Sequence, residues 1–201
     1  MIQAHALGYL AVFVPPGLLV VGRALETDWL LPVAFFLVMP ILRAVFGSVG
    51  EARESWNERT AKFLMLIPVV YCSVIVPVMM WSFAGAVKSG LTGWRAEIFC
   101  LGLAMVGALA HCVAHDLVHR HSAWARRLGM AVAAAAGHPF FGFEHLAHHA
   151  YNRDDEAGHV PKREENVYQF AWRRMLAVPA QAVEWSRLMM SRSARPSLLD
   201  S

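Results

Sequence analysis

The histidines of this 201-residue sequence gather in one stretch, which begins at His111 and ends at His149 and holds eight of the ten. Three of the eight are spaced at i, i+4 and i+8, and three more at i, i+3 and i+4, so two helices would each carry imidazoles on one face. Neutral imidazole is the commonest protein ligand of several transition metals. The spacing therefore predicts a metal site built by two helices. Its candidate ligands are His111, His115, His119, His145, His148 and His149.

The other four histidines stand alone, and a single histidine is more often a hydrogen-bonded structural residue than a ligand. They are His5, His121, His138 and His159. The three cysteines include no C-x-x-C pair, which disfavours a thiolate site for copper(I) or iron–sulfur. An all-imidazole set with more than four members suits a pair of irons that activates dioxygen better than a structural zinc. A haem with two imidazole ligands is the rival, although it would need histidines facing each other near the middle of two spans.

The composition predicts an integral membrane protein of the all-α class, because 57% of the residues are hydrophobic and only 16% are charged. We expect four transmembrane helices, at Ala6–Gly22, Trp29–Gly47, Phe63–Val87 and Ala96–His119. The apolar segment Gly129–Phe143 is short for a crossing and predicts a re-entrant or buried helix. Val167–Arg192 mixes apolar and basic residues, which predicts an amphipathic helix at the membrane surface. Residues 193–201 are expected to form a disordered tail.

The basic residues predict the orientation. A cytoplasmic N-terminus and four crossings leave only Arg23, Lys88 and Arg95 on the far side. This multi-pass arrangement in the cell inner membrane places the metal site on the cytoplasmic side, among membrane lipids. The net charge of +3 is small, and the basic residues lie between apolar spans, so we expect no binding to nucleic acid.

Two motifs resemble a known family. HDLVHR, which begins at His115, and FEHLAHH, which ends at His149, are similar to the histidine boxes of the integral-membrane non-haem diiron family. That family contains alkane hydroxylases, xylene monooxygenases and fatty-acid desaturases. H-x-x-H-H at the second box is the desaturase spacing, whereas DDEAG and ENVYQF (Glu165–Phe170) resemble the hydroxylase branch.

The resemblance implies two non-haem iron ions as cofactor, held by His115, His119, His145, His148 and His149, with His111 as a substitute for a missing ligand. It implies an alkane 1-monooxygenase-like oxidoreductase that hydroxylates an apolar C–H bond of an alkane or alkyl-aromatic. The reaction would use O₂ and electrons from a rubredoxin or ferredoxin-type protein. A fatty-acid desaturase-like, lipid-modifying enzyme is the first alternative, and an inactive fragment that only binds metal is the second.

Two features depart from the family pattern. Asp116 stands where the first box usually has Glu, and no histidine follows His159, although the family has a third box after further spans. We therefore expect residues 1–192 to form a single membrane hydroxylase-like domain that is incomplete at its C-terminus.

Overall fold

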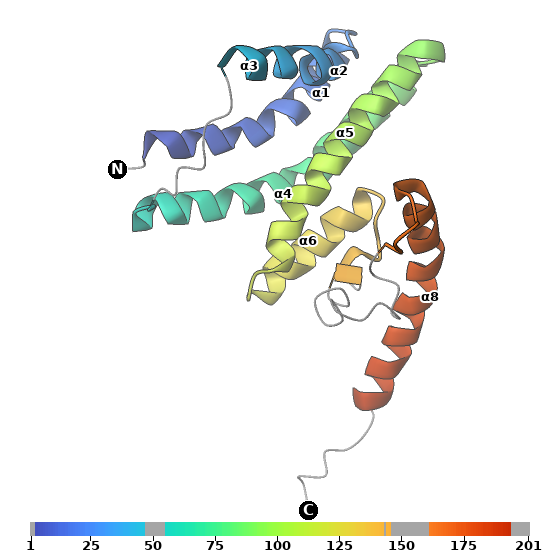
Figure 1. Ribbon diagram of the computed structural model, residues 1–201. Coiled ribbons are helices and arrows are strands. Elements are labelled where there is room, and N and C mark those ends of the chain that lie inside the picture. The colour runs from blue at the N-terminus through green and yellow to red at the C-terminus, as the bar shows by residue number, and fades with distance from the viewer. Residues whose placement is uncertain (1–2, 47–54, 143, 146–160, 194–201) are drawn as a thin grey trace, which may run out of the picture. The chain divides into compact units, whose positions relative to one another are not determined.

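The computed structural model describes residues 3–46, 55–142, 144–145 and 161–193, and all the regular secondary structure in these residues is helical (Figure 1). This confirms the all-α class. The chain forms two compact units, residues 1–137 and residues 138–201, which are described in turn.

Three helices of the first unit are long and apolar enough to cross a membrane. They are Ala6–Ala24, Glu58–Lys88 and Gly93–Val118. They correspond to the first, third and fourth predicted spans. The predicted second span is a shorter apolar helix, Leu30–Val45, so a fourth crossing stays a prediction.

Prolines explain the irregular parts of the N-terminal helices. The 3₁₀-helix η1 (Ala4–Phe13) passes into α1 (Val14–Ala24) where Pro15 and Pro16 enter the first turn, which tolerates residues without an N–H. The next helical segment is continuous and consists of α2 (Leu30–Val33), the π-helical part η2 (Ala34–Val38) and α3 (Met39–Phe46). Pro40 removes one backbone hydrogen bond from this segment, and its ring crowds the preceding turn. The backbone therefore widens into a π turn just before Pro40.

The turn between α1 and α2 is fixed by a buried ion pair. Arg23 donates hydrogen bonds to both carboxylate oxygens of Asp28, at 2.9 and 3.0 Å. Gly22 lets the chain close tightly, because a Cβ there would lie 3.0 Å from the carbonyl oxygen of Thr27. Arg95, near the start of the fourth predicted span, donates to the carbonyl oxygen of Glu26 at 3.1 Å and so ties that span to the turn.

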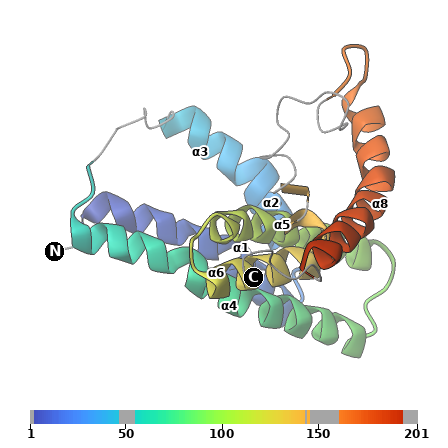
Figure 2. The same cartoon turned by 90° about the horizontal axis from the view of Figure 1, so that it is seen from below.

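The helix α4 (Glu58–Lys88) lies beside η1 and α1 (Figures 1 and 2). Asn57 caps its N-terminus by accepting a hydrogen bond from the Thr60 N–H at 2.9 Å. Gln3 joins the two elements, since its backbone N–H donates to the Thr60 hydroxyl at 3.0 Å and its side chain accepts from the Asn57 N–H at 3.1 Å.

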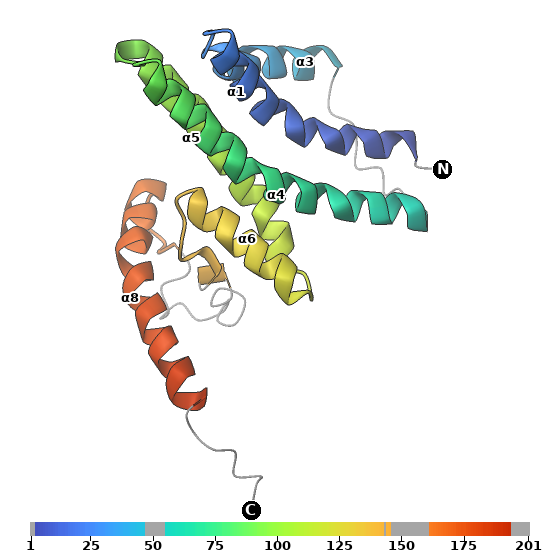
Figure 3. The same ribbon diagram turned by 180° about the vertical axis from the view of Figure 1, so that it is seen from behind.

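A helical hairpin completes the first unit. The helix α5 (Gly93–Val118) is followed by a short turn and by α6 (Ala123–Ala135), which lies beside the C-terminal part of α5 (Figure 3). Gly129 permits this contact, because a Cβ there would lie 2.7 Å from the carbonyl oxygen of Ala114. The predicted re-entrant or buried segment is thus a short packed helix that begins earlier than expected and ends before Gly137, whose φ is 97°.

The second unit contains α8 (Val167–Ser193), which matches the predicted amphipathic helix and continues through Pro179. Tyr168, Trp172, Met175 and Leu176 are exposed on it. Residues 194–201, where a disordered tail was expected, lie outside the described residues.

Candidate metal-binding histidines

Two of the candidate ligands are neighbours at the C-terminal end of α5. His115 lies in the last turn of the helix and His119 is its C-cap residue. Their Nε2 atoms are 2.9 Å apart, and their ring centroids are 4.8 Å apart. His115 is half-buried and His119 is exposed. The first predicted imidazole face therefore exists, with two nitrogen atoms close enough to share one proton or one metal ion.

The third histidine of this face, His111, lies one turn earlier in α5 and is half-buried. Its position on the helix is the predicted one. Its part in a ligand set stays a prediction.

An ion pair anchors the end of α5. Both Nε and Nη2 of Arg120 donate to one carboxylate oxygen of Asp116, at 3.2 and 2.7 Å. The remaining terminal nitrogen of Arg120, Nη1, donates to the carbonyl oxygen of Met65 in α4 at 2.8 Å. The acidic residue of the first box therefore fixes an arginine that fastens this helix end to its neighbour.

The turn after α5 is closed from α6. Nη1 of Arg126 donates to the carbonyl oxygens of Arg120 and His121, at 3.2 and 3.0 Å. The last carbonyls of a helix have no partner within it, so a cation placed there is favourable. Arg120 and Arg126 therefore hold the chain at the end of α5, where His115 and His119 lie.

In the second unit, the residue before His145 is the centre of a polar network. Glu144 accepts hydrogen bonds from Nε and Nη2 of Arg174 at 3.0 and 2.8 Å, and its other oxygen lies 3.0 Å from Nε2 of His138. Nη1 of Arg174 donates to the side-chain oxygen of Gln181 at 3.3 Å. The network ties the second histidine box to α8. His138 is hydrogen-bonded through its ring, in keeping with the structural role predicted for a lone histidine.

The ring of His145 stacks on Phe141, with centroids 5.2 Å apart and an angle of 26° between the planes. This contact restricts the direction in which the imidazole points. His148, His149 and His159 lie outside the described residues, as do Asp154 to Gly158 of the DDEAG sequence.

The ENVYQF sequence builds the start of α8. The side chain of Asn166 accepts hydrogen bonds from the backbone N–H groups of Tyr168 and Gln169, both at 3.0 Å. The side-chain oxygen of Gln169 in turn accepts from the Asn166 N–H at 3.0 Å. This reciprocal pattern is a capping box. Glu165 pairs with Arg173, whose Nε and Nη2 each donate at 2.7 Å. These hydrogen bonds lower the pKa of the Glu165 carboxyl to about 2.

Sequence reasoning missed the role of Arg174. A basic residue on an amphipathic surface helix predicts a solvent contact, yet Arg174 is only 7% exposed and is paired with Glu144. The available signal was the carboxylate that directly precedes a histidine box, since a partly buried carboxylate needs a partner.

Comparisons with known proteins found similarity to two alkane 1-monooxygenases. No family model matches the chain, and no solved structure matches it. It is 28% identical over 149 residues to alkane 1-monooxygenase 1 of Pseudomonas aeruginosa, covering 70% of this chain and 38% of that protein. It is 26% identical over 166 residues to an alkane 1-monooxygenase of Pseudomonas putida, covering 75% of this chain and 40% of that protein. The chain thus spans about two fifths of the length of these curated relatives. The chain is thus similar, at modest identity, to two alkane 1-monooxygenases, over the part of the sequence that carries the histidine boxes.

Proposed function

We propose that this protein is a membrane-bound monooxygenase that hydroxylates an apolar C–H bond of an alkane or alkyl-aromatic. The observation that carries the proposal is the paired imidazoles of His115 and His119 at the end of an apolar helix, in a chain similar to two alkane 1-monooxygenases.

The donor atoms fit a metal. Two imidazole nitrogens bound to one metal at ~2.1 Å and at right angles would lie ~3 Å apart, and the Nε2 atoms of His115 and His119 are 2.9 Å apart. Nitrogen donors suit iron, among other metals. We propose that two non-haem irons are held by the histidines of both boxes, with His111 as a further ligand. The proposed set is His111, His115, His119, His145, His148 and His149.

The bound irons would supply the activation of O₂, which no protein side chain provides. The chain's own residues supply position. Asp116 and Arg120 hold the end of α5, and Arg174 holds Glu144, the residue next to His145. Such supporting contacts orient ligands before a metal binds, and their loss weakens metal binding or activity.

We propose that the reaction takes place beside the three apolar helices. They would exclude water and admit an apolar substrate from the bilayer. In the proposed orientation the imidazoles of α5 face the cytoplasmic side of the inner membrane. Arg126 and Arg127 are exposed near that helix end and are available to an acidic rubredoxin or ferredoxin-type electron donor.

The alternative, a desaturase-like enzyme, rests on the H-x-x-H-H spacing of the second box, whereas both curated relatives are monooxygenases. The inactive-fragment alternative predicts bound metal without turnover.

Product analysis with labelled oxygen separates these possibilities. The full chain, in lipid nanodiscs with iron, a rubredoxin or ferredoxin and its reductase, is given ¹⁸O₂ with n-octane, p-xylene or a fatty-acyl substrate. The proposal expects an alcohol that carries ¹⁸O, and its loss in His115→Ala but not in His121→Ala, the exposed histidine two residues after His119. A new double bond without added oxygen would favour the desaturase alternative, and metal binding without product would favour the inactive fragment.

A further inference from the structure

The helical turn that carries the second histidine box holds a stack of aromatic rings. Residues 141–142 and 144–145 are helical, so Phe141 and His145, which are four positions apart, share one face of the turn. The Phe141 ring lies nearly parallel to the His145 imidazole, with centroids 5.2 Å apart and 26° between the planes. It also contacts the ring of His138, at 5.6 Å and 54°. Phe141 is only 9% exposed, so the ring that contacts the proposed ligand is itself held by its surroundings.

The backbone beside His145 is fixed by a separate set of contacts. The Glu144 N–H donates to the carbonyl oxygen of Phe140 at 3.0 Å. One carboxylate oxygen of Glu144 accepts from Nε and Nη2 of Arg174 at 3.0 and 2.8 Å, and the other lies 3.0 Å from Nε2 of His138. These contacts determine where the backbone of the next residue, His145, lies, but they do not determine how its ring is turned.

The rotation of its ring decides whether an imidazole can bind a metal, because the lone pair of the ligand nitrogen must point at the ion. The torsion that turns a histidine ring, χ2, has broad minima, so the packing around the ring sets its value. A neighbouring aromatic ring in an offset, nearly parallel arrangement is a favourable contact that other rotations of the imidazole would lose. The phenyl ring of Phe141 has no donor atom, so it orients His145 without competing for the metal.

We propose that Phe141 is a positioning residue, which orients the His145 imidazole before a metal binds. The proposal rests on the proposed function, because it takes His145 as an iron ligand. It assigns the two kinds of order to two sets of contacts: Glu144, with Arg174 and His138, places the backbone, and Phe141 turns the ring. A purely structural role for Phe141 predicts something different, namely a less stable chain whose folded form binds the metal as before.

Titration of the full chain with iron(II), in detergent and without oxygen, tests this role independently of turnover. Phe141→Leu removes the ring and keeps an apolar side chain. We expect it to raise the Kd for iron(II) ~2–10-fold, which is the value of one aromatic pair. Phe141→Tyr keeps the ring and should bind iron(II) as the unaltered chain does.

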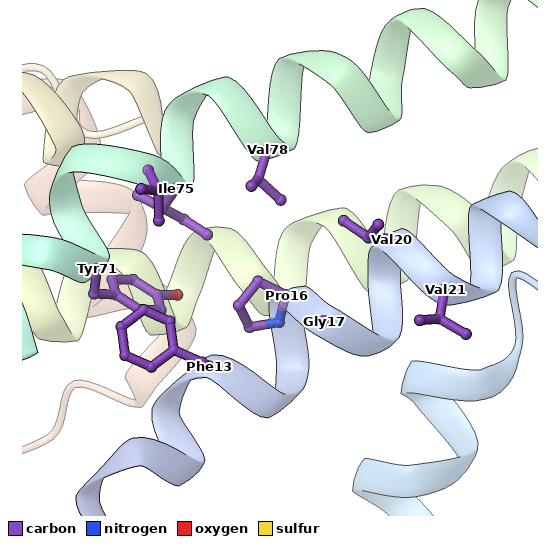
Figure 4. A pocket seen from close by; sticks show the side chains of 9 residues that line it. Phe13, Pro16, Gly17, Val20, Val21, Tyr71, Ile75 and Val78 are labelled. Atoms are coloured by element: carbon purple, nitrogen blue, oxygen red, sulfur yellow. The ribbon is translucent and has the colours of Figure 1, made fainter.

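Phe13 provides a matched control in the first unit. Its ring packs on the ring of Tyr71 at a centroid distance of 5.6 Å (Figure 4), so Phe13→Leu also removes one aromatic contact, but on helices that do not carry the second box. This variant should leave the Kd for iron(II) unchanged. Thermal unfolding of every variant shows that the chains compared are folded.

NMR of the metal-free chain tests the same role without a substitution at Phe141. In a chain that carries labelled histidine, the resonances of His145 are those that His145→Ala lacks. The ring current of the stacked phenyl group should move the His145 ring protons upfield of those of His121, an exposed histidine. Ring protons of His145 at the position of His121 would overturn the proposal, because the imidazole would then not be held against Phe141.

The affinities separate this proposal from the proposed function. His145→Ala should raise the Kd for iron(II) more than Phe141→Leu does. An unchanged Kd in Phe141→Leu alone would overturn the positioning role and leave the ligand assignment in place. An unchanged Kd in His145→Ala would overturn both, since Phe141 would have no ligand to orient. Equal rises in Phe141→Leu and Phe13→Leu would assign the effect to general loss of packing and would overturn the positioning role.

Discussion

The Nε2 atoms of His115 and His119 lie 2.9 Å apart across the last turn of α5. At this separation the two nitrogens cannot both carry a proton directed at the other, so at least one presents its lone pair. The arrangement is held by contacts outside the two rings, because Arg120 joins Asp116 on the same helix to Met65 on α4. The pair is therefore preorganised as a donor site.

Loss of one imidazole of the pair should weaken metal binding. We expect His119→Ala to reduce the affinity of the chain for iron(II) at least tenfold, because ligand supports alone are worth ~10–100-fold and a ligand is worth more. His121→Ala, at an exposed residue nearby, should leave the affinity unchanged. Titration of each detergent-solubilised variant and of the unaltered chain with iron(II) under anaerobic conditions measures these affinities. Equal affinities would remove His119 from the ligand set.

The contact between α5 and α6 should not tolerate a larger residue at Gly129. A Cβ there would lie 2.7 Å from the Ala114 carbonyl oxygen and 3.0 Å from the Cβ of Leu117, so overpacking should cost ~1–3 kcal/mol in Gly129→Ala. Gly17→Ala, in an α-helix with no atom near the added Cβ, should instead stabilise by ~0.5–1 kcal/mol. The unfolding temperatures should move in opposite directions in circular dichroism. A rise for Gly129→Ala would mean that the two helices are not in close contact there.

The pair formed by Glu144 and Arg174 should behave as one unit. Removing either charge leaves the other partly buried charge without its ion-pair partner, so Glu144→Gln and Arg174→Met should each destabilise the chain by ~1–3 kcal/mol. The double variant should lose clearly less stability than the sum of the losses in the two single variants. A double-mutant cycle on unfolding free energies measures the coupling, and Glu164→Gln, at an exposed residue, serves as control. Additive losses would show that the two side chains do not interact.

The ion pair at the start of α8 predicts a specific pH dependence. Hydrogen bonds from Arg173 lower the pKa of Glu165 from 4.5 to about 2. A lowered pKa means that the carboxylate stabilises the folded state above pH 4.5, and that this contribution is lost as the pH falls toward 2. A ¹³C NMR titration of labelled Glu165 should give a midpoint near 2, and Arg173→Gln should return it toward 4.5. A midpoint near 4.5 in the unaltered chain would contradict the ion pair.

The sequence predicts much of this architecture because its signals are local. Apolar runs mark the long helices, and the i, i+4 spacing places His115 and His119 together on one helix face. The limits of α6 were harder to predict, because the helix begins in the polar sequence before Gly129, where the apolar pattern is absent. Its packing on α5, and not its hydropathy, determines where it lies.

Long-range polar contacts could not be predicted. The pairing of Glu144 with Arg174 joins residues 30 positions apart, and the bond from Arg120 to Met65 joins residues 55 positions apart. Neither follows from periodicity, because a charged residue in a membrane protein is equally well explained by topology. The burial of the Tyr71 hydroxyl could not be predicted either. Only the packing of α1 against α4 shows that this hydroxyl has no hydrogen-bond partner among the described residues.

Iron content per chain tests directly whether these histidines are ligands. The full chain is purified in detergent, supplied with iron(II) and washed, and its metal is measured by elemental analysis beside His145→Ala and His121→Ala. We expect about two irons per chain in the unaltered protein and in His121→Ala, and little or none in His145→Ala. Iron near zero in the unaltered chain, or the same iron content in His145→Ala, would contradict the assignment of these histidines as ligands.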